Sequence, residues 1–298
     1  MKILETAGID VSKKVIDVHL HKKGLYCQFE NDLKGFNRMG NWLENNSVAK
    51  EALLVALEHT GLYSYNLANY LAGQDFNYVV LPALEIKRSV GIARGKADKV
   101  DAKRIALYAY EKRERITLNK KSPENITKLK RLLSLRERIV KQRAGYKASM
   151  KEHLSMLPKK EAEVLVKCQM RMIKCLDKEI DYLENEIENI IESDEKIKVQ
   201  YKLITTIKGV GPQTALYMIV ATEGFKKFDS WRKFASYCGT APFPNTSGSS
   251  IRGRTKVSNL ANKKIKSLLD LCAKSSIQFN EEMKQYYLAR VSKQKKTT

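Results

Sequence analysis

The chain has 298 residues, and its 55 lysines and arginines against 33 aspartates and glutamates give a formal net charge of +22. Because clustered Lys and Arg bind phosphates, this balance favours a polyanionic partner, and nucleic acid is the first candidate. The sequence has no run of about 18 apolar residues and no secretory leader pattern at Met1, which argues against a membrane or exported protein and predicts a cytoplasmic one. The scattered cysteines form no C-x-x-C pair, so they indicate neither a disulfide framework nor a zinc site.

Residues 1–122 carry the pattern of an α/β domain. Three strand-like segments joined by short connections predict an antiparallel meander, at residues 3–10, 15–20 and 25–29. Helices and strands then alternate: a helix at 33–43, a fully buried strand at 52–58, a helix at 63–72, a strand at 77–81 and a helix beyond Asp98. This β-β-β-α-β-α-β-α order is that of a ribonuclease-H-like fold, in which the first and fourth strands are neighbours.

Residues 123–200 have no strand pattern and are dense in charge, which predicts a helical connector. One long helix has an apolar a/d seam that needs a partner: Ile173, Leu176, Ile180, Leu183, Ile187 and Ile190. An antiparallel mate is expected upstream, with its own apolar residues: Ile126, Leu129, Leu132, Leu133, Ile139 and Val140. Leu157-Pro158 is expected to form the turn of this coiled coil. The pattern fits a spacer and a dimerisation arm equally well.

Residues 201–298 predict a mostly helical domain. An apolar helix end, the segment Lys208-Gly209-Val210-Gly211 and a new helix fit a helix-hairpin-helix motif. Its glycines permit a tight turn that offers backbone N–H groups to a DNA phosphate. An ordinary glycine-rich connector between two helices is the alternative.

The glycine- and serine-rich stretch 239–256 lacks regular periodicity, so we expect a functional or disordered loop. Arg252, Arg254 and Lys256 alternate within it, a spacing that suits a phosphate track. A serine hydroxyl among these cations can replace water as nucleophile and form a phosphoserine ester that conserves bond energy for rejoining strands. Ser-Gly pairs are also common turn formers, and a flexible basic loop explains the same residues.

Four carboxylates have the character of a metal site. Asp10 lies on the first strand, Glu58 ends the buried fourth strand, and Asp98 and Asp101 stand three residues apart on one helix face. Mg²⁺ prefers oxygen ligands, and two ions about 3.5–4 Å apart would offset the repulsion among the acids and serve phosphoryl transfer. Turn-capping and helix-dipole roles are the alternative for single acids, although Glu58 at the end of an apolar strand requires a partner or a metal.

Five segments, in order along nearly the whole chain, carry a resemblance to a known family: Gly8-Ile9-Asp10-Val11-Ser12-Lys13, Glu58-His59-Thr60-Gly61, Lys96-Ala97-Asp98-Lys99-Val100-Asp101-Ala102, Gly209-Val210-Gly211, and Ala241-Pro242 with Ser247-Gly248 and Arg252-Gly253. Together they closely resemble the transposases of the insertion sequence 110 family, which are related to the Piv DNA invertase.

The resemblance implies a RuvC-like DEDD catalytic domain at residues 1–122, a coiled-coil connector at 123–200 and a transposase domain with a catalytic serine at 201–298. Matched by motif, the metal-binding acids fall on Asp10, Glu58, Asp98 and Asp101, and the serine falls on Ser247. Family members are recombinases guided by a noncoding bridge RNA that pairs with donor and target DNA, and they assemble as tetramers. The implied cofactor is Mg²⁺, as two ions, and the implied location is the nucleoid of a bacterial or archaeal cell.

The mechanism that follows is a hypothesis in which the acids bind magnesium and Ser247 attacks the scissile phosphate to give a covalent protein–DNA intermediate. Because the serine and the acids lie in different predicted domains, we expect the site to be shared between subunits or completed on nucleic acid. Two alternatives stay open: a nuclease of the Holliday-junction resolvase type that uses metal-activated water, and a non-catalytic nucleic-acid-binding scaffold. The family pattern usually continues beyond the region matching 279–291 with a basic helical segment, so a short member or a truncated chain is expected.

Overall fold

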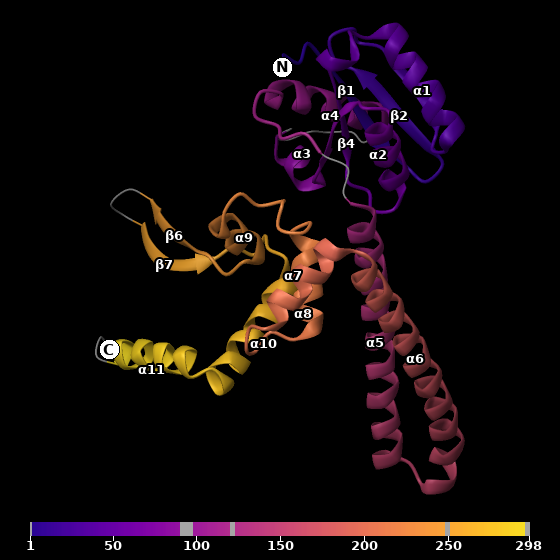
Figure 1. The fold of residues 1–298 in the computed structure, drawn as a ribbon. Coiled ribbons are helices and arrows are strands. Elements are labelled where there is room, and N and C mark those ends of the chain that lie inside the picture. The colour runs from indigo at the N-terminus through magenta and orange to yellow at the C-terminus, as the bar shows by residue number, and fades with distance from the viewer. Residues whose placement is uncertain (1, 90–97, 120–122, 248–250, 296–298) are drawn as a thin grey trace. The chain divides into compact units, whose positions relative to one another are not determined.

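The computed structural model describes residues 2–89, 98–119, 123–247 and 251–295 (Figure 1). The chain forms two compact units, Met1–Lys121 and Ser122–Thr298. Each unit has a hydrophobic core of its own. The first is a mixed α/β unit and the second is mostly helical, as the sequence predicts.

The first unit is built around a five-stranded mixed sheet with the strand order β3-β2-β1-β4-β5. Its strands are β1 (Glu5–Val11), β2 (Val15–Leu20), β3 (Tyr26–Glu30), β4 (Leu53–Glu58) and β5 (Asn77–Leu81). β1, β2 and β3 form an antiparallel meander, and β4 pairs in parallel with both β1 and β5. The predicted meander and the predicted contact of the first and fourth strands are confirmed, and the order is consistent with a ribonuclease-H-like fold.

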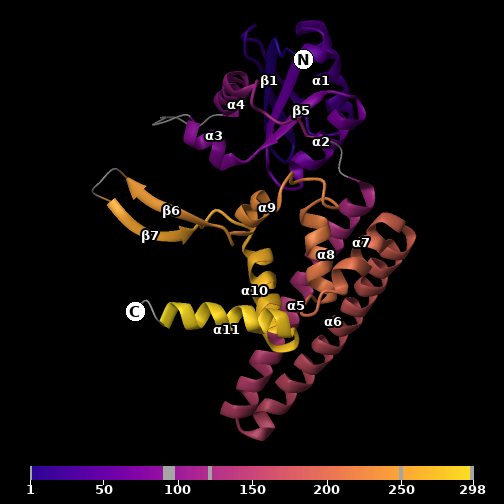
Figure 2. The ribbon, with the colours of Figure 1, turned by 60° about the vertical axis from the view of Figure 1, so that its left-hand side comes forward.

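Helices cover both faces of this sheet, as Figures 1 and 2 show. One face carries α1 (Leu33–Asn46) and α2 (Tyr63–Gly73), and the other carries α3 (Ala83–Ser89) and α4 (Asp98–Lys112). A short 3-10 helix, η1 (Lys50–Ala52), leads into β4. The helix α3 is an addition to the predicted order, since a single apolar residue of it, Ile86, is buried and leaves little periodicity to detect.

Strand alternation explains why the core of the first unit has two sides. In β1, Ile9 and Val11 are buried under α1 and α2, so the residues that alternate with them face α3 and α4. One of these is Gly8, where a Cβ atom would come within 2.2 Å of the carbonyl oxygen of Ala102 and of the amide nitrogen of Ala106. The missing side chain therefore lets α4 lie directly on β1.

The second unit begins with the antiparallel helical hairpin that the a/d seam predicts, formed by α5 (Glu124–Met156) and α6 (Lys159–Ser193). The turn falls at Leu157 and Pro158, as expected. An ion pair between Arg143 Nη1 and Asp177 Oδ1, 2.6 Å apart, ties the two helices together. Toward the open end of the hairpin, seam residues are buried as predicted, except that Ile191 is buried in place of the predicted Ile190; the others are Ile126, Leu129, Leu133, Ile180, Leu183 and Ile187.

Short helices and one hairpin complete the second unit: α7 (Glu195–Thr205), α8 (Pro212–Ala221), α9 (Trp231–Cys238), β6 (Pro242–Ser247), β7 (Ile251–Val257), α10 (Lys263–Phe279) and α11 (Glu281–Lys295). The apolar faces of α7 and α8 pack against the open end of the α5–α6 hairpin. No helix in the described parts of the chain is long and apolar enough to span a membrane.

The expectation of an irregular loop over residues 239–256 is wrong, because β6 and β7 form an antiparallel hairpin there. The described side chains of both strands are largely exposed, so no apolar alternation marks them in the sequence. Pro242 and Pro244 also argue against a strand, yet a two-stranded hairpin consists of edge strands, which tolerate proline.

Candidate active site

Two of the predicted acids, Asp10 and Glu58, lie at the same end and on the same face of the sheet. Ile9 of β1 and Leu57 of β4 are register partners in a parallel pair, and both are buried under α1 and α2. The residues that follow them, Asp10 and Glu58, therefore belong to the opposite face, at the carboxyl ends of neighbouring strands. Both are half-buried. The carboxyl ends of the strands are where open α/β sheets bind their ligands.

The third predicted acid, Asp98, begins α4 close to this pair. The Thr6 hydroxyl donates to the carbonyl of Ala106 at 2.8 Å, and two residues further along β1, Gly8 lies against Ala102. Four helical residues and two strand residues both advance about 6 Å. α4 therefore runs antiparallel to β1, and one more such step brings the backbone of Asp98 level with the acid of β1. The side chain of Asp98 lies outside the part of the chain that the structure describes.

The fourth predicted acid, Asp101, forms an ion pair within α4. Arg104 Nη1 lies 2.8 Å from Asp101 Oδ1, and the two side chains are only 22% and 26% exposed. The guanidinium satisfies the carboxylate locally, which the sequence pattern does not reveal. Asp101 can therefore bind a metal ion only if it shares or releases Arg104.

The donor set fits a hard divalent cation. Its members are carboxylates, whose oxygens suit Mg²⁺ or Mn²⁺ better than zinc. Among the described residues, no three Asp, Glu, His or Cys side chains are grouped closely enough to hold a metal. Asp10 and Glu58 are thus the pair that the fold brings together, and Asp98 and Asp101 can complete a set only through the start of α4.

A polar cluster that is not among the predicted site residues adjoins Asp10 on the same face. Asp17 of β2 is the register partner of Asp10 and is only 2% exposed. The Tyr26 hydroxyl and Gln28 Nε2, both from β3, donate to Asp17 Oδ1, the latter at 3.1 Å. The sequence does contain a signal, an aspartate between apolar strand residues, but only the β1–β2 register places it beside Asp10.

The glycine turn between α7 and α8 is tightly packed, as a short inter-helix turn requires. Gly209 has a φ of 96°, and a Cβ atom there would lie 2.4 Å from Ser276 Oγ of α10. The same hydroxyl donates to the carbonyl of Lys208 at 2.9 Å and so fixes the turn. Gly211 is the N-cap residue of α8 and has no side chain to cap the helix, which leaves the first N–H groups open to another acceptor.

Ser247 is the last residue of β6, and its register partner on β7 is Ile251. The side chains of Ser247 and Arg252 lie outside the part of the chain that the structure describes, whereas Arg254 and Lys256 are exposed. The serine belongs to the second unit and the acids belong to the first. No single compact unit therefore contains the whole predicted catalytic set.

The expected track of alternating cations on β7 needs correction. Arg252 pairs with Thr246 and Lys256 pairs with Phe243, with a register shift between them. Because Thr246 and Phe243 are three residues apart on β6, they belong to opposite faces. A bulge of this kind breaks the alternation of the strand, so the Arg252 and Lys256 positions lie on opposite faces of the hairpin.

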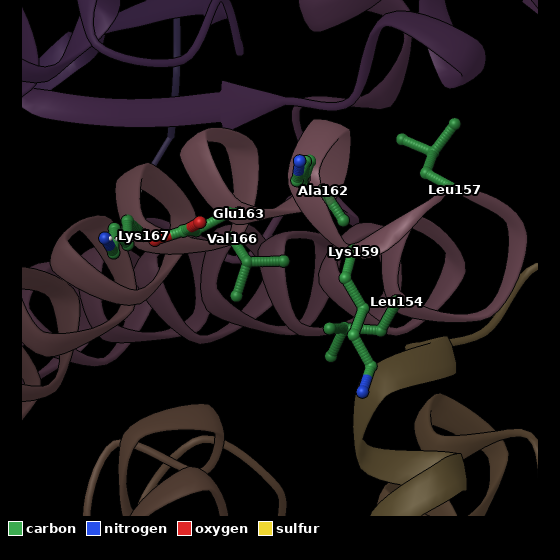
Figure 3. Close-up of a pocket in the computed structure, with 8 residues that line it drawn as sticks. Leu154, Leu157, Lys159, Ala162, Glu163, Val166 and Lys167 are labelled. Carbon is green, nitrogen blue, oxygen red and sulfur yellow. Dashed lines mark hydrogen bonds and ion pairs between the residues drawn. The ribbon is translucent and has the colours of Figure 1, made fainter.

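A cavity of about 420 Å³ lies at the tip of the α5–α6 hairpin (Figure 3). Leu154, Leu157 and Val166 line it, together with lysines of the first turns of α6. Met156 and Val164 nearby are 82% and 73% exposed. The lining contains a single carboxylate, Glu163, among apolar side chains and lysines, which is unsuited to a metal ion, so this cavity differs in chemistry from the site of the acids.

Comparison with known proteins adds two family matches. A model described as a transposase, of the DEDD type of insertion sequence 110, matches residues 7–157, which is half of the chain. A model for the transposase IS116/IS110/IS902 family matches residues 201–288. The chain is also similar to the pilin gene-inverting proteins of Moraxella bovis and Moraxella lacunata, each 28% identical over 271 residues that cover 88% of this chain and 80% of the relative.

Proposed function

The chain belongs to the IS116/IS110/IS902 family of transposases, and from this membership we propose that it cuts and rejoins DNA with a carboxylate metal centre in its first unit and a serine in its second. Membership makes the chain a DNA recombinase, an enzyme whose substrate is DNA. The name of the related pilin gene-inverting proteins denotes the inversion of a DNA segment. Inversion and transposition both require DNA strands to be broken and rejoined.

The metal centre consists of Asp10, Glu58, Asp98 and Asp101, which bind Mg²⁺, as two ions. One observation carries this proposal: Asp10 and Glu58 share a face at the carboxyl ends of neighbouring strands, beside the start of α4. When bound, such ions supply Lewis acidity that stabilises the charge on the scissile phosphate and on the leaving oxygen. The residues of the chain supply the ligands and their spacing, and Arg104 balances the charge of Asp101 until a cation takes its place.

Ser247 is the proposed nucleophile. Its hydroxyl oxygen attacks the scissile phosphorus, the bond from phosphorus to the sugar oxygen breaks, and the leaving oxygen takes up a proton while the serine loses its own to a base. The phosphoserine ester keeps the energy of the broken bond, so a DNA hydroxyl can rejoin the strand by the reverse attack. Arg254 and Lys256, which are exposed on β7, and Arg252 beside the serine are proposed to contact the DNA phosphates.

The turn between α7 and α8 is a second proposed contact to the DNA backbone, as a helix-hairpin-helix motif. Lys208 is exposed at this turn, and the backbone N–H groups of Gln213 and Thr214, after Pro212, lie at the N-terminus of α8, which favours an anion. Such contacts position DNA without reading its bases.

A noncoding bridge RNA is the proposed guide, pairing with donor and target DNA. The excess of cations, +22 over the chain, suits a protein that binds two kinds of nucleic acid. In an RNA-guided system, base pairing supplies the sequence specificity and the protein contributes backbone contacts.

A homo-oligomer, from dimer to tetramer, is proposed because the acids and the serine lie in different units. The tip of the α5–α6 hairpin is the proposed contact with a second copy, since Leu154, Met156 and Val164 are 60%, 82% and 73% exposed there. Apolar side chains gathered on one tip favour association that removes them from water.

A recombination assay in cells tests the proposal even when the guide sequence has not been identified. The gene is supplied with its natural flanking DNA, which brings any guide RNA and the DNA ends, and joined product is quantified by sequencing. Ser247→Ala should abolish product, whereas Ser250→Ala, a matched change in the same segment, should preserve it. Normal product from Ser247→Ala would overturn the serine assignment, and DNA cleavage without joining would favour a nuclease that uses water.

A further inference from the structure

We propose that Asp17 and Tyr26 form a positioning pair that holds Asp10 and the first turn of α4 in place, and so assembles the metal-binding carboxylates. This inference rests on the proposed metal centre and assigns a role to residues outside the four acids. Neither residue of the pair is proposed to touch the metal or the DNA.

The first half of the pair is a carboxylate buried beside a candidate ligand. Asp17 is the register partner of Asp10 in the antiparallel β1–β2 pair and is 2% exposed. Directly opposed residues of antiparallel strands share a face of the sheet and have Cβ atoms about 4.5–5.5 Å apart. Asp17 therefore flanks Asp10 on the side away from Glu58, because β1 lies between β2 and β4.

A buried carboxylate is unfavourable unless donors satisfy it. Both donors to Asp17 come from β3: the Tyr26 hydroxyl, and Gln28 Nε2 at 3.1 Å. Because both bonds end on Oδ1, they fix the orientation of the Asp17 side chain, which is the cross-strand neighbour of Asp10. This geometry suits a supporting residue better than a metal ligand, since Asp17 Oδ1 already accepts two hydrogen bonds.

The second half of the pair connects the sheet to α4. Lys99 Nζ lies over the ring of Tyr26, 4.8 Å from its centroid, which is a cation–π distance. Lys99 follows Asp98 in the first turn of α4. Tyr26 thus contacts Asp17 through its hydroxyl and the start of α4 through its ring.

The two contacts of Tyr26 explain how acids from separate elements can be held at a fixed spacing. Asp10 is set by the β1–β2 register, while Asp98 and Asp101 depend on where α4 begins. Residues that orient metal ligands from outside the coordination shell typically change metal affinity or activity by about 10–100-fold when they are replaced. Loss of the Tyr26 hydroxyl should loosen this arrangement and leave the fold intact.

Direct metal binding tests the inference, with Mn²⁺ as the probe and the full chain titrated by electron paramagnetic resonance. Tyr26→Phe keeps the ring under Lys99 but removes the bond to Asp17, and should weaken Mn²⁺ binding about tenfold. Asp17→Ala should weaken it at least as much, and Asp17→Asn, which keeps an acceptor at Oδ1, should restore most of the affinity. Thermal unfolding of each variant is followed in parallel.

Tyr110→Phe is the matched control, because this tyrosine of α4 also carries cations over its ring, Lys22 and Arg113, but lies toward the other end of the helix. Wild-type affinity in Tyr26→Phe, like that of Tyr110→Phe, would overturn the positioning role. Asp10→Asn separates the two proposals. If Asp10→Asn abolishes Mn²⁺ binding while Tyr26→Phe leaves the affinity unchanged, only the positioning role fails. If Asp10→Asn binds Mn²⁺ normally, the proposed metal centre fails and this inference fails with it.

Discussion

Asp10 and Glu58 follow the register partners Ile9 and Leu57 and so end side by side on neighbouring parallel strands, on the face that α4 covers. Two carboxylates placed in this way repel one another unless a cation lies between or beside them. The relationship is a consequence of strand order, because β1 and β4 become neighbours only when the chain crosses over after the meander.

Removing either carboxylate charge should stop recombination. Asp10→Asn and Glu58→Gln preserve the size of the side chain but remove a metal-binding carboxylate. The yield of joined DNA should therefore fall more than about 100-fold, beyond the range typical of replacing a residue that only orients a metal ligand. Glu44→Gln is the control, because Glu44 lies on α1, on the other side of the sheet, and its side chain is 55% exposed. Wild-type yield from Asp10→Asn would rule out the proposed metal centre.

Gly8→Ala should destabilise the first unit. The new Cβ would meet the backbone of α4 at 2.2 Å, at Ala102 and Ala106, and overpacking of this kind costs about 1–3 kcal/mol or more when the backbone must move. Chemical unfolding measures the loss. Gly73→Ala is the matched control, since nothing lies within 4 Å of a Cβ there, and an equal effect of the two changes would show that the close approach of α4 is not tight.

The second unit should lose stability in acid through Glu137. Burial tends to raise the pKa of this carboxyl, but hydrogen bonds from Lys141, Lys264 and Tyr217 together lower it below its usual value of 4.5. A carboxyl whose pKa is lower in the folded state contributes stability above its unfolded pKa and loses it as the pH falls through the folded one. The contribution should therefore be present at neutral pH and fade below about pH 4.5.

Unfolding by urea at neutral and acidic pH checks this prediction. Glu137→Gln should be less stable than the wild type at neutral pH, and the difference should shrink as the pH is lowered. Glu179→Gln, an exposed change on α6, should show no such dependence. A gap between wild type and Glu137→Gln that stays constant across the pH range would contradict the assignment.

Polar substitutions at the tip of the α5–α6 hairpin should weaken self-association. Met156→Ser with Val164→Ser removes apolar side chains that are 82% and 73% exposed, so the mass measured by light scattering should fall toward that of one chain. Tyr182→Ser serves as the control, because Tyr182 is 60% exposed on the same hairpin but away from the tip. An unchanged mass in the double variant would assign oligomerisation to another surface.

The parts of the fold that the sequence predicts are those with a distinct apolar pattern. The strand β4 is an unbroken apolar run, predicted at 52–58 and observed at Leu53–Glu58. The α5–α6 seam has a helical apolar period, and the turn between its helices falls at Leu157 and Pro158 as predicted. The β6–β7 hairpin has no buried face to impose a period, and its prolines suggest a loop.

The sequence predicts a residue of the candidate site only where the residue's own local pattern marks it. Glu58 stands out because it ends an apolar strand, whereas the importance of Asp17 depends on its register with Asp10. Likewise, the ion pair between Asp101 and Arg104 is one of several spacings that the helix allows. Cross-strand register and side-chain rotamer are products of tertiary packing, so they are not readable from spacing alone.

Acids of the first unit and a serine of the second are proposed to act on one phosphate. Mass spectrometry of protein crosslinked to DNA during recombination in cells is the decisive test of this cooperation. We expect a nucleotide adduct on the peptide that contains Ser247, present in the wild type and in Ser250→Ala but lost in both Ser247→Ala and Asp10→Asn. An adduct that persists in Ser247→Ala, or one that forms normally in Asp10→Asn, would contradict the proposed mechanism.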